Sequence, residues 1–215
     1  MMKIAVLVSG NGSNLQALID AQCAQLWSGE IVGVISNKAD AYALKRAQQA
    51  NIETQVIEHK AYPHREMFDD AMHQQLIQWG VDLVILAGFM RILSEKFVKA
   101  WEGKMINIHP SLLPLYKGMH THQRVLNTGD VFHGCTVHYV TAELDAGPAL
   151  LQGVVKVAQN DNVNTLAKRV HELEHLIYPQ VVEWICNQTI QYQSGQALFK
   201  GKPISKPLQL CQMLK

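Results

Sequence analysis

The chain has 215 residues, of which 48% are hydrophobic and 17% are charged, and its formal net charge at pH 7 is +1. This length supports one sizeable core or two small, closely fused domains. The nearly balanced charge gives no electrostatic reason to expect a nucleic-acid partner. A transmembrane helix is not expected, because no run of about 18 apolar residues occurs.

The first apolar stretch is too short for a signal peptide and runs directly into a glycine-rich loop. The cysteines are widely scattered and lack the spacing of metal or redox motifs. They are Cys23, Cys135, Cys186 and Cys211. Both features indicate a cytoplasmic protein with reduced thiols.

Apolar runs alternate with helix-like segments through the first half of the chain. Strands are predicted at residues 3–8, 31–35, 54–57, 81–87 and 104–108, and helices at residues 13–25, 39–50, 64–79 and 94–101. The nearly all-apolar run at 81–87 is typical of a central strand that is covered on both faces. This alternation predicts an α/β fold with a mainly parallel, twisted sheet and a Rossmann-like N-terminal half.

The second half of the chain has a different pattern. Residues 136–140 and 150–157 alternate in polarity or are β-branched, which predicts a hairpin that extends the sheet with antiparallel strands. Residues 162–187 form a long amphipathic helix, which Pro179 is expected to kink or divide. Beyond Gln188 no clear periodicity remains, and this tail is expected to be loosely packed.

A glycine-rich loop, Ser9-Gly10-Asn11-Gly12-Ser13-Asn14, joins the first predicted strand to the first helix. Glycine lets backbone N–H groups approach a ligand, and the start of a helix favours an anion. A dinucleotide site would need a third glycine, where Leu15 stands, and an acidic residue after the second strand, which is absent. The loop therefore fits a single phosphate group, held by Gly12, Ser13 and Asn14. The alternative is a tight turn in which Ser13 or Asn14 caps the helix.

Asn107 and His109 stand at the end of a predicted buried strand, and Asp145 lies in a later turn. Residues two apart on an extended segment point the same way, and ligands of open α/β sheets bind beyond the carboxyl ends of the strands. An amide and a protonated imidazole suit the stabilisation of a tetrahedral oxyanion in direct acyl transfer. Asp145 would orient the imidazole and move protons from an attacking amine. The alternative is a loop histidine beside an ordinary turn.

Four blocks of the sequence, at residues 9–14, 87–93, 107–114 and 134–147, resemble the phosphoribosylglycinamide formyltransferase family. The resemblance runs from the first strand to about Trp184 and implies a three-layer formyltransferase fold. It also implies a reaction of purine (IMP) biosynthesis. The formyl group of the co-substrate 10-formyltetrahydrofolate passes to the amine of 5-phosphoribosylglycinamide, without a covalent enzyme intermediate, giving formylglycinamide ribonucleotide and tetrahydrofolate.

The resemblance also implies roles for individual residues. The catalytic residues would be Asn107, His109 and Asp145. The residues that bind phosphoribosylglycinamide would be Gly12, Ser13, Asn14 and Glu174. The folate-binding residues would be Arg65, Met90, Arg91, Ile92, Leu93, Asn107, Thr141, Ala142, Glu143, Leu144 and Asp145. The sequence departs from the family pattern at Leu115, where many relatives carry Lys, and at Ala142, where an acidic residue is frequent, which leaves the loop conformation open.

Two other motifs carry rival interpretations. His171-Glu172-Leu173-Glu174-His175 matches the H-E-x-x-H pattern of zinc hydrolases, but a catalytic zinc needs a third protein ligand, for which only Glu183 stands nearby. His120-Thr121-His122 is a second possible metal motif in a loop. No metal is expected, because formyl transfer explains more of the residues. The basic pair Lys45-Arg46 is expected to lie on a solvated helix face.

We therefore predict a formyltransferase domain over residues 1–188, with a phosphate-binding half (1–103) and a catalytic half (104–188), followed by a tail over residues 189–215. Alternatives of the same class are formyltetrahydrofolate hydrolase and methionyl-tRNA formyltransferase, which usually carry an additional domain. An alternative of a different class is a non-catalytic protein that binds a phosphate sugar. The expected partners are small molecules, without nucleic acid or membrane, and the chain is expected to act as a monomer or a homodimer.

Overall fold

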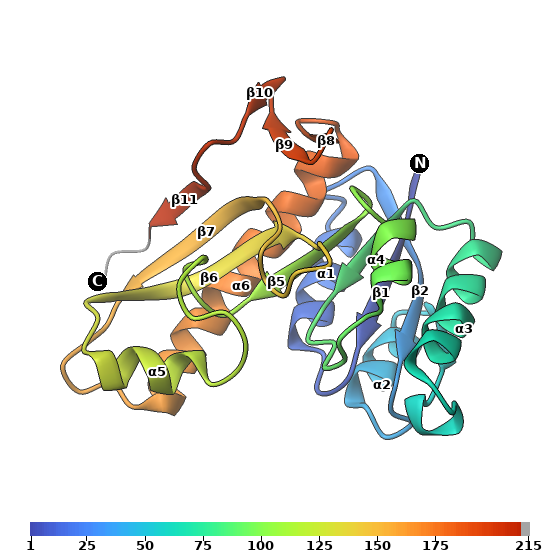
Figure 1. Cartoon of the computed structure of the whole chain (residues 1–215), viewed down its shortest axis with the longest axis horizontal. Helices are drawn as coiled ribbons and strands as arrows, with labels where there is room; N and C mark the ends of the chain where they lie inside the picture. Colours follow the sequence, from blue (N-terminus) through green and yellow to red (C-terminus); the bar gives the residue numbers. More distant parts are fainter. Residues whose placement is uncertain (212–215) are drawn as a thin grey trace. The chain divides into compact units, whose positions relative to one another are not determined.

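The computed structural model describes residues 1–211, so residues 212–215 of the predicted tail lie outside the described part. The chain divides into two compact units, Met1–Asn107 and Ile108–Lys215. The first unit ends inside a strand that continues into the second (Figure 1). Each unit is described separately below.

The first unit is built on parallel strands in the order β3-β2-β1-β4-β5. The strands are β1 (Met2–Val8), β2 (Gly29–Ser36), β3 (Glu53–Val56), β4 (Leu83–Leu86) and β5 (Met105–His109). The helices are α1 (Ser13–Cys23), α2 (Tyr42–Gln49), the short 3-10 helix η1 (His59–Ala61), α3 (Arg65–Gln78) and α4 (Glu95–Ala100).

The strand order of the first unit reverses direction at β1. The chain first moves outward through β2 to β3 and then returns to β4 on the other side of β1. Because parallel crossovers are right-handed, this reversal places α1 and α2 on one face and α3 and α4 on the other (Figure 1). Ligands of such sheets bind where the order reverses, at the carboxyl ends of the strands. The loops after β1 and β4 meet at this point.

The packing of the first unit follows from its sequence. The run from Ile4 to Val8 is completely buried, as expected for a parallel strand that is covered on both faces. On β2, a Cβ atom at Gly33 would lie only 2.4 Å from the ring of Trp79. A glycine is needed at this position because the indole at the end of α3 packs directly against the strand.

The second unit contains the strand order β5-β6-β7-β11 and a separate small sheet in the order β10-β9-β8. Its strands are β6 (Phe132–Tyr139), β7 (Ala149–Lys156), β8 (Ile190–Gln193), β9 (Gln196–Phe199), β10 (Lys202–Pro203) and β11 (Leu208–Cys211). Strands β6 and β7 are antiparallel, whereas β11 runs parallel to β7. Its helices are α5 (Thr121–Thr128) and α6 (Val163–Cys186), and α6 packs against β6 and β7.

The predicted α/β fold with a mainly parallel sheet and antiparallel strands in the second half is confirmed. Two expectations need correction. Helix α6 continues from Val163 to Cys186, so Pro179 does not divide it. The tail beyond Gln188, in which no strand was expected, forms β8 to β11 over its described part, although most of its side chains there are exposed. Within residues 1–211, no helix is long and apolar enough to span a membrane.

The missed strands had a local signal in the sequence. Residues Ser194-Gly195 and Lys200-Gly201 both have positive φ angles and join β8 to β9 and β9 to β10. Two-residue hairpin turns of this kind require positive φ at both positions, which favours glycine at the second. The two X-Gly pairs, six residues apart, therefore mark a small meander.

Candidate active site

The predicted phosphate loop lies between β1 and α1 in the first unit. Helix α1 begins at Ser13, so the position before the helix is occupied by Gly12, with φ of 76°. A Cβ atom there would lie 2.6 Å from the Cβ of Ala43. The first turn of α1, which lies wholly within the described residues, has no acidic residue and no side-chain cap. The interpretation that Ser13 or Asn14 caps this helix is therefore wrong, and the helix start is open to an anion.

Arg46 anchors this loop from α2. Its Nε donates to the backbone carbonyl of Asn11 at 2.9 Å, and its Nη2 donates to the Asn11 side-chain oxygen at 3.0 Å. Its Nη1 donates to Oε1 of Gln16 at 3.0 Å. The expectation that Arg46 belongs to a solvated helix face was wrong, because its guanidinium group is engaged by these hydrogen bonds. Asn11 lies 35 residues away in the sequence, so no local pattern indicates this contact. Lys45 remains exposed.

Ser9 joins the phosphate loop to the loop after β4. Its hydroxyl donates to Oδ1 of Asn37 at 2.6 Å and accepts from the backbone N–H of Met90 at 2.8 Å. Two of the predicted folate residues in this loop, Met90 and Ile92, are each 62% exposed. Exposed apolar side chains beside the reversal point of the sheet suit a flat heterocycle. Of the other predicted folate residues in this unit, Arg91 and Arg65 are exposed and Leu93 is half-buried.

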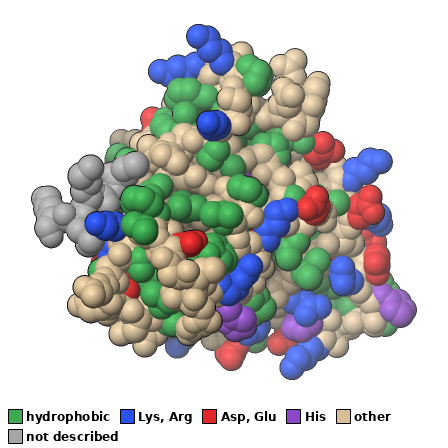
Figure 2. Space-filling model, turned by 60° about the vertical axis from the view of Figure 1, so that its left-hand side comes forward, with side chains coloured by type: hydrophobic (Ala, Val, Ile, Leu, Met, Phe, Trp, Pro, Cys, Tyr) green, Lys and Arg blue, Asp and Glu red, His purple; other side chains and the backbone are tan. Residues whose placement is uncertain are grey.

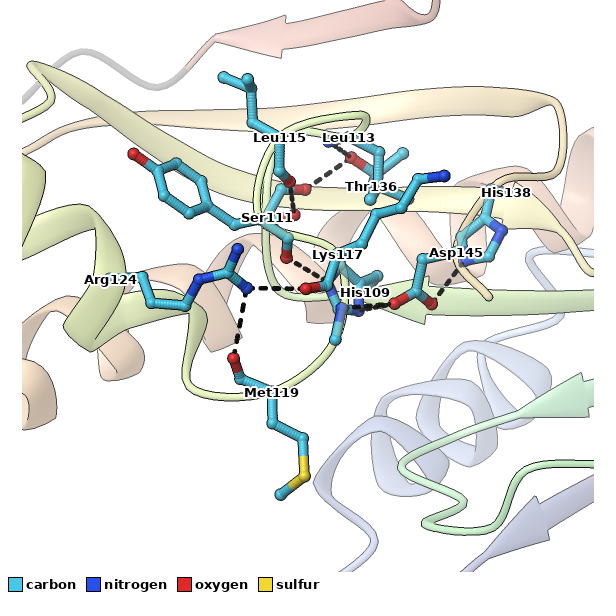
Figure 3. A network of polar contacts seen from close by, with 12 residues as sticks. His109, Ser111, Leu113, Leu115, Lys117, Met119, Arg124, Thr136, His138 and Asp145 are labelled. Atoms are coloured by element: carbon cyan, nitrogen blue, oxygen red, sulfur yellow. Dashed lines mark hydrogen bonds and ion pairs between the residues drawn. The ribbon is translucent and has the colours of Figure 1, made fainter. Parts of the chain in front are cut away.

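His109 and Asp145 lie together in the second unit (Figure 3). His109 Nδ1 is 3.4 Å from Asp145 Oδ2, and the two side chains are only 8% and 7% exposed. His109 Nε2 lies 3.0 Å from the backbone carbonyl of Tyr116. Both ring nitrogens thus face oxygens that can only accept, an arrangement that fits the doubly protonated imidazolium. Asp145 Oδ2 also accepts from the backbone N–H of Gly118 at 2.9 Å.

Asp145 adopts an unusual backbone conformation. Its φ is 50°, in the left-handed region that aspartate and asparagine enter more readily than most residues. Two residues later, a Cβ atom at Gly147 would lie 1.9 Å from the carbonyl oxygen of Tyr139. The turn that carries Asp145 therefore needs glycine at 147 in order to pass this close to the end of β6.

The loop that follows His109 is held by a buried polar network (Figure 3). The Thr136 hydroxyl donates to the Ser111 carbonyl at 2.6 Å and accepts from the Leu113 N–H at 3.1 Å. Gln152 Nε2 donates to the Leu113 carbonyl at 2.9 Å. Sequence reasoning did not identify Thr136 and Gln152, although buried polar residues on the predicted hairpin were a possible signal.

The remaining predicted folate residues of the second unit lie in the turn before Asp145. Ala142, Glu143 and Leu144 are exposed, and Thr141 is half-buried. Glu143 Oε1 is 2.8 Å from Nζ of Lys117, which links this turn to the loop after β5. The turn is accessible to a ligand and is tied to the same loop that contacts His109.

Two predicted site residues occupy positions of different kinds. Asn107 is half-buried on β5, opposite Leu86 of β4 and two residues before His109. Glu174 is buried on α6. Burial and, to a lesser extent, the charge of Glu174 raise the pKa of the Cys135 thiol and of the Tyr178 hydroxyl well above their usual values.

The zinc motif does not form a recognisable metal centre. His171 and Glu172 are exposed, whereas Glu174 faces the protein interior. Over residues 1–211, no group of three or more histidine, cysteine, aspartate or glutamate side chains is arranged to hold a metal ion. The motif is explained by the amphipathic pattern of α6.

His122 pairs with a histidine on β6. Its Nδ1 lies 2.9 Å from Nε2 of His133, and one of the two nitrogens must carry the proton of this hydrogen bond. Burial, together with the charge of nearby histidines, lowers the pKa of each ring to about 4. Both rings are therefore neutral at pH 7, and this pair holds α5 against β6.

A family model described as formyl transferase matches residues 2–182. The chain belongs to the formyl transferase family. Membership implies a folate co-substrate and small-molecule substrates. The loop after β1, the His109–Asp145 pair and the turn before Asp145 all lie within the matched residues.

Individual relatives within the formyl transferase family are similar over most of the chain. The phosphoribosylglycinamide formyltransferase of Escherichia coli is 46% identical over 201 residues, covering 94% of this chain and 95% of that protein. The human trifunctional purine biosynthetic protein adenosine-3 is 49% identical over 189 residues, which are only 19% of its length. A structure of the phosphoribosylglycinamide formyltransferase from Coxiella burnetii has a TM-score of 0.93 at 47% identity, covering 97% of this chain and 98% of that one.

Proposed function

We propose that this protein transfers the formyl group of 10-formyltetrahydrofolate to the amine of 5-phosphoribosylglycinamide, in a single direct step of purine synthesis. The observation that carries the proposal is the buried contact between His109 Nδ1 and Asp145 Oδ2 at 3.4 Å, on the loop side of the strand that bears Asn107. This contact supplies a fixed cationic donor, as charge development on a carbonyl oxygen requires. The similarity to phosphoribosylglycinamide formyltransferases over nearly the whole chain supports the choice of substrates.

The proposed reaction passes through a tetrahedral intermediate. The substrate amine attacks the formyl carbon, and the carbonyl oxygen becomes an oxyanion that accepts a hydrogen bond from the Asn107 amide and is stabilised by the positive charge of the His109 imidazolium. A single preorganised donor of this kind is worth about 3 kcal/mol. Asp145 takes a proton from the attacking nitrogen and passes it to the folate nitrogen as the bond between that nitrogen and the formyl carbon breaks, which returns Asp145 to its carboxylate form.

Substrate binding is assigned to the other predicted residues. The backbone of Gly12, Ser13 and Asn14 would hold the phosphate at the start of α1, and Glu174 would contact the ribose. The folate would bind Asn107, Arg65 at the start of α3, and residues of the loop after β4 and of the turn that carries Asp145. The loop and turn residues are Met90, Arg91, Ile92, Leu93, Thr141, Ala142, Glu143, Leu144 and Asp145. No step of the proposal requires a metal.

The charge distribution is compatible with small-molecule substrates. On the face drawn in Figure 2, basic and acidic side chains are interspersed, and the formal net charge of the whole chain is +1. An extended surface of one sign, as used to bind polyanions, is not seen on that face.

The test is an assay with both substrates and with each one omitted. We expect tetrahydrofolate and formylglycinamide ribonucleotide to appear in equal amounts, measured by absorbance and mass spectrometry, only when both substrates are present. Tetrahydrofolate that appears without the ribonucleotide would indicate a hydrolase instead. Binding of phosphoribosylglycinamide without any turnover would indicate the non-catalytic alternative.

A further inference from the structure

The loop after β4, residues 87–94, is held at few points. In the described part of the chain, three of its backbone N–H groups bond to other parts of the protein. The first, of Ala87, donates to a carbonyl of β1 at 2.9 Å, and the last, of Ser94, donates to a carboxyl group of α3 at 2.6 Å. The third is the N–H of Met90, which donates to Oγ of Ser9 at 2.8 Å. Ser9 is thus the residue that holds the middle of the loop.

The middle of this loop is otherwise open to solvent. Met90, Arg91 and Ile92 are exposed, and the loop has no helix or strand between its two ends. An exposed segment with few backbone hydrogen bonds opens locally at a low free-energy cost. The position of the three exposed residues therefore depends on the bond between Ser9 and Met90.

The Ser9 hydroxyl is arranged to accept this bond. Ser9 and Asn37 are each 3% exposed, and Oγ of Ser9 donates to Oδ1 of Asn37 at 2.6 Å. A hydroxyl has one proton, so this bond fixes the direction of the O–H group and leaves lone pairs for the N–H of Met90. A donor that accepts a bond at the same time is strengthened, because successive hydrogen bonds polarise one another.

The loop after β1 is held by separate contacts, although Ser9 is its first residue. The carbonyl of Gly10 accepts from the N–H of Ala43 at 3.1 Å, and Arg46 bonds to Asn11. Both contacts come from α2. The segment that follows Ser9 is therefore held without the Ser9 hydroxyl.

We propose that Ser9 is a positioning residue for the folate substrate, whose buried hydroxyl holds the N–H of Met90 and so fixes the loop after β4 in the conformation that folate binds. This inference rests on the proposed formyl transfer, in which that loop binds 10-formyltetrahydrofolate. A protein that adopts its binding conformation for only part of the time binds its ligand more weakly by that fraction. Ser9 thus serves a different substrate from the residues that follow it in the same loop.

Steady-state kinetics of the full chain give the first readout. We expect Ser9→Ala to raise the KM for 10-formyltetrahydrofolate about fivefold, the value of one hydrogen bond. The KM for the ribonucleotide and kcat should stay within about twofold, because the contacts from α2 and the pair of His109 and Asp145 are unchanged. Ser9→Thr keeps the hydroxyl and should recover most of the wild-type KM.

A second buried serine provides a matched control. Ser36, at the end of β2, lies opposite Val8 of β1, and its hydroxyl contacts the backbone of Lys38 at 2.8 and 3.1 Å. Ser36→Ala removes the same group at the same edge of the sheet, but leaves the bond between Ser9 and Met90. We expect its KM for 10-formyltetrahydrofolate to equal that of the wild type.

Several kinetic outcomes would overturn the proposal. An equal rise of the folate KM in Ser36→Ala would show that any buried serine lost at this edge has the same effect. An equal rise of both KM values in Ser9→Ala would show that the hydroxyl supports the whole edge. A wild-type folate KM in Ser9→Ala would remove Ser9 from substrate binding.

Amide hydrogen exchange, measured by NMR without substrates, tests the contact itself. We expect the N–H of Met90 to exchange about fivefold faster in Ser9→Ala than in the wild type, because it loses its acceptor. The N–H groups of Ala87 and Ser94 have other acceptors and should keep their wild-type rates. An unchanged rate at Met90, or an equal increase at all three positions, would contradict the proposal. A failure of the proposed formyl transfer is recognised separately, by a wild-type protein that shows no turnover.

Discussion

The loop after β1 and the turn that carries Asp145 differ in the groups they present and in how far those groups are buried. The first is built from backbone groups and a glycine with positive φ, is held from outside by Arg46, and leaves Gly10 and Asn11 exposed. The second places titratable side chains less than 10% exposed within 4 Å of one another. An exposed loop can exchange a charged ligand with water, whereas buried charges act more strongly on a reacting atom.

This difference predicts that changes in the two regions have different kinetic effects. Substitutions in the loop after β1 should change the KM for the ribonucleotide and leave kcat nearly constant. Substitutions around Asp145 should change kcat and leave KM nearly constant. The predictions below follow this distinction, from the largest expected effect to the smallest.

Replacing Asp145 by asparagine should lower kcat by about 10³-fold, because the variant can no longer accept a proton or pair with the His109 imidazolium. Asparagine tolerates the positive φ of this position, so the fold should be retained. Stopped-flow or steady-state assays with saturating substrates measure the effect. Turnover within tenfold of the wild type would remove Asp145 from the mechanism.

Replacing Ser13 by aspartate should raise the KM for the ribonucleotide by about 10- to 100-fold, through repulsion between two negative charges at the start of α1. The same charge should leave the protein as stable as the wild type or slightly more stable, because acidic residues favour the first turn of a helix. This one variant should therefore bind the ribonucleotide more weakly, while its unfolding temperature stays the same or rises slightly. Ser13→Asn is the neutral control, and an unchanged KM in Ser13→Asp would contradict the phosphate assignment.

Replacing Arg46 by methionine should raise the same KM by about tenfold, because Asn11 of the loop loses two hydrogen bonds and Gln16 of α1 loses one, of which each contributes about 1 kcal/mol or less. The value of kcat should change little. Lys45→Met is a matched control, since Lys45 is the neighbouring exposed cation on the same helix. Equal effects of the two substitutions would show that only general charge matters there.

Lowering the pH should destabilise the second unit through its buried histidines. The pKa of His133 is lowered to about 4, so the unfolded chain binds a proton more readily than the folded one between about pH 6.5 and 4. The stability is present above pH 6.5 and is lost as the pH falls, with about 1 kcal/mol lost between pH 7 and 5.5. Urea unfolding at these two values measures the loss.

A control variant separates this effect from the general response to acid. His133→Phe should reduce the pH dependence of the unfolding free energy, whereas His64→Gln, at an exposed position in the first unit, should not. A pH dependence that is identical in the wild type and His133→Phe would show that His133 titrates normally in the folded protein.

Local sequence patterns predicted the first unit better than the second. The alternation of apolar strands with helices gives β1 to β5 and α1 to α4, because each of these elements is encoded in its own periodicity. The placement of His109 beside Asp145 followed from the combination of residue types and from the family resemblance. The sequence alone carried no signal for the distance between them.

The features that were missed depend on contacts between distant residues. The contact of Arg46 with Asn11 depends on how α2 packs against the loop after β1. The contact of His138 with Asp145 depends on the position of the turn that carries Asp145. Neither contact has a signal in the local sequence. Helix α5 is short and polar, begins after His120 in a left-handed conformation, and is held by the pair of His122 and His133. Tertiary contacts rather than intrinsic propensity determine such elements.

Strand β11 has a consequence for association between molecules. It pairs in parallel with β7, from Leu208 opposite Leu151 onward, and so occupies hydrogen-bonding groups that would otherwise lie open along the side of that strand. Unoccupied strands of this kind recruit strands from neighbouring copies and promote aggregation. The last described segment of the chain therefore acts as a built-in shield against self-association, although it lies outside the residues that match the family.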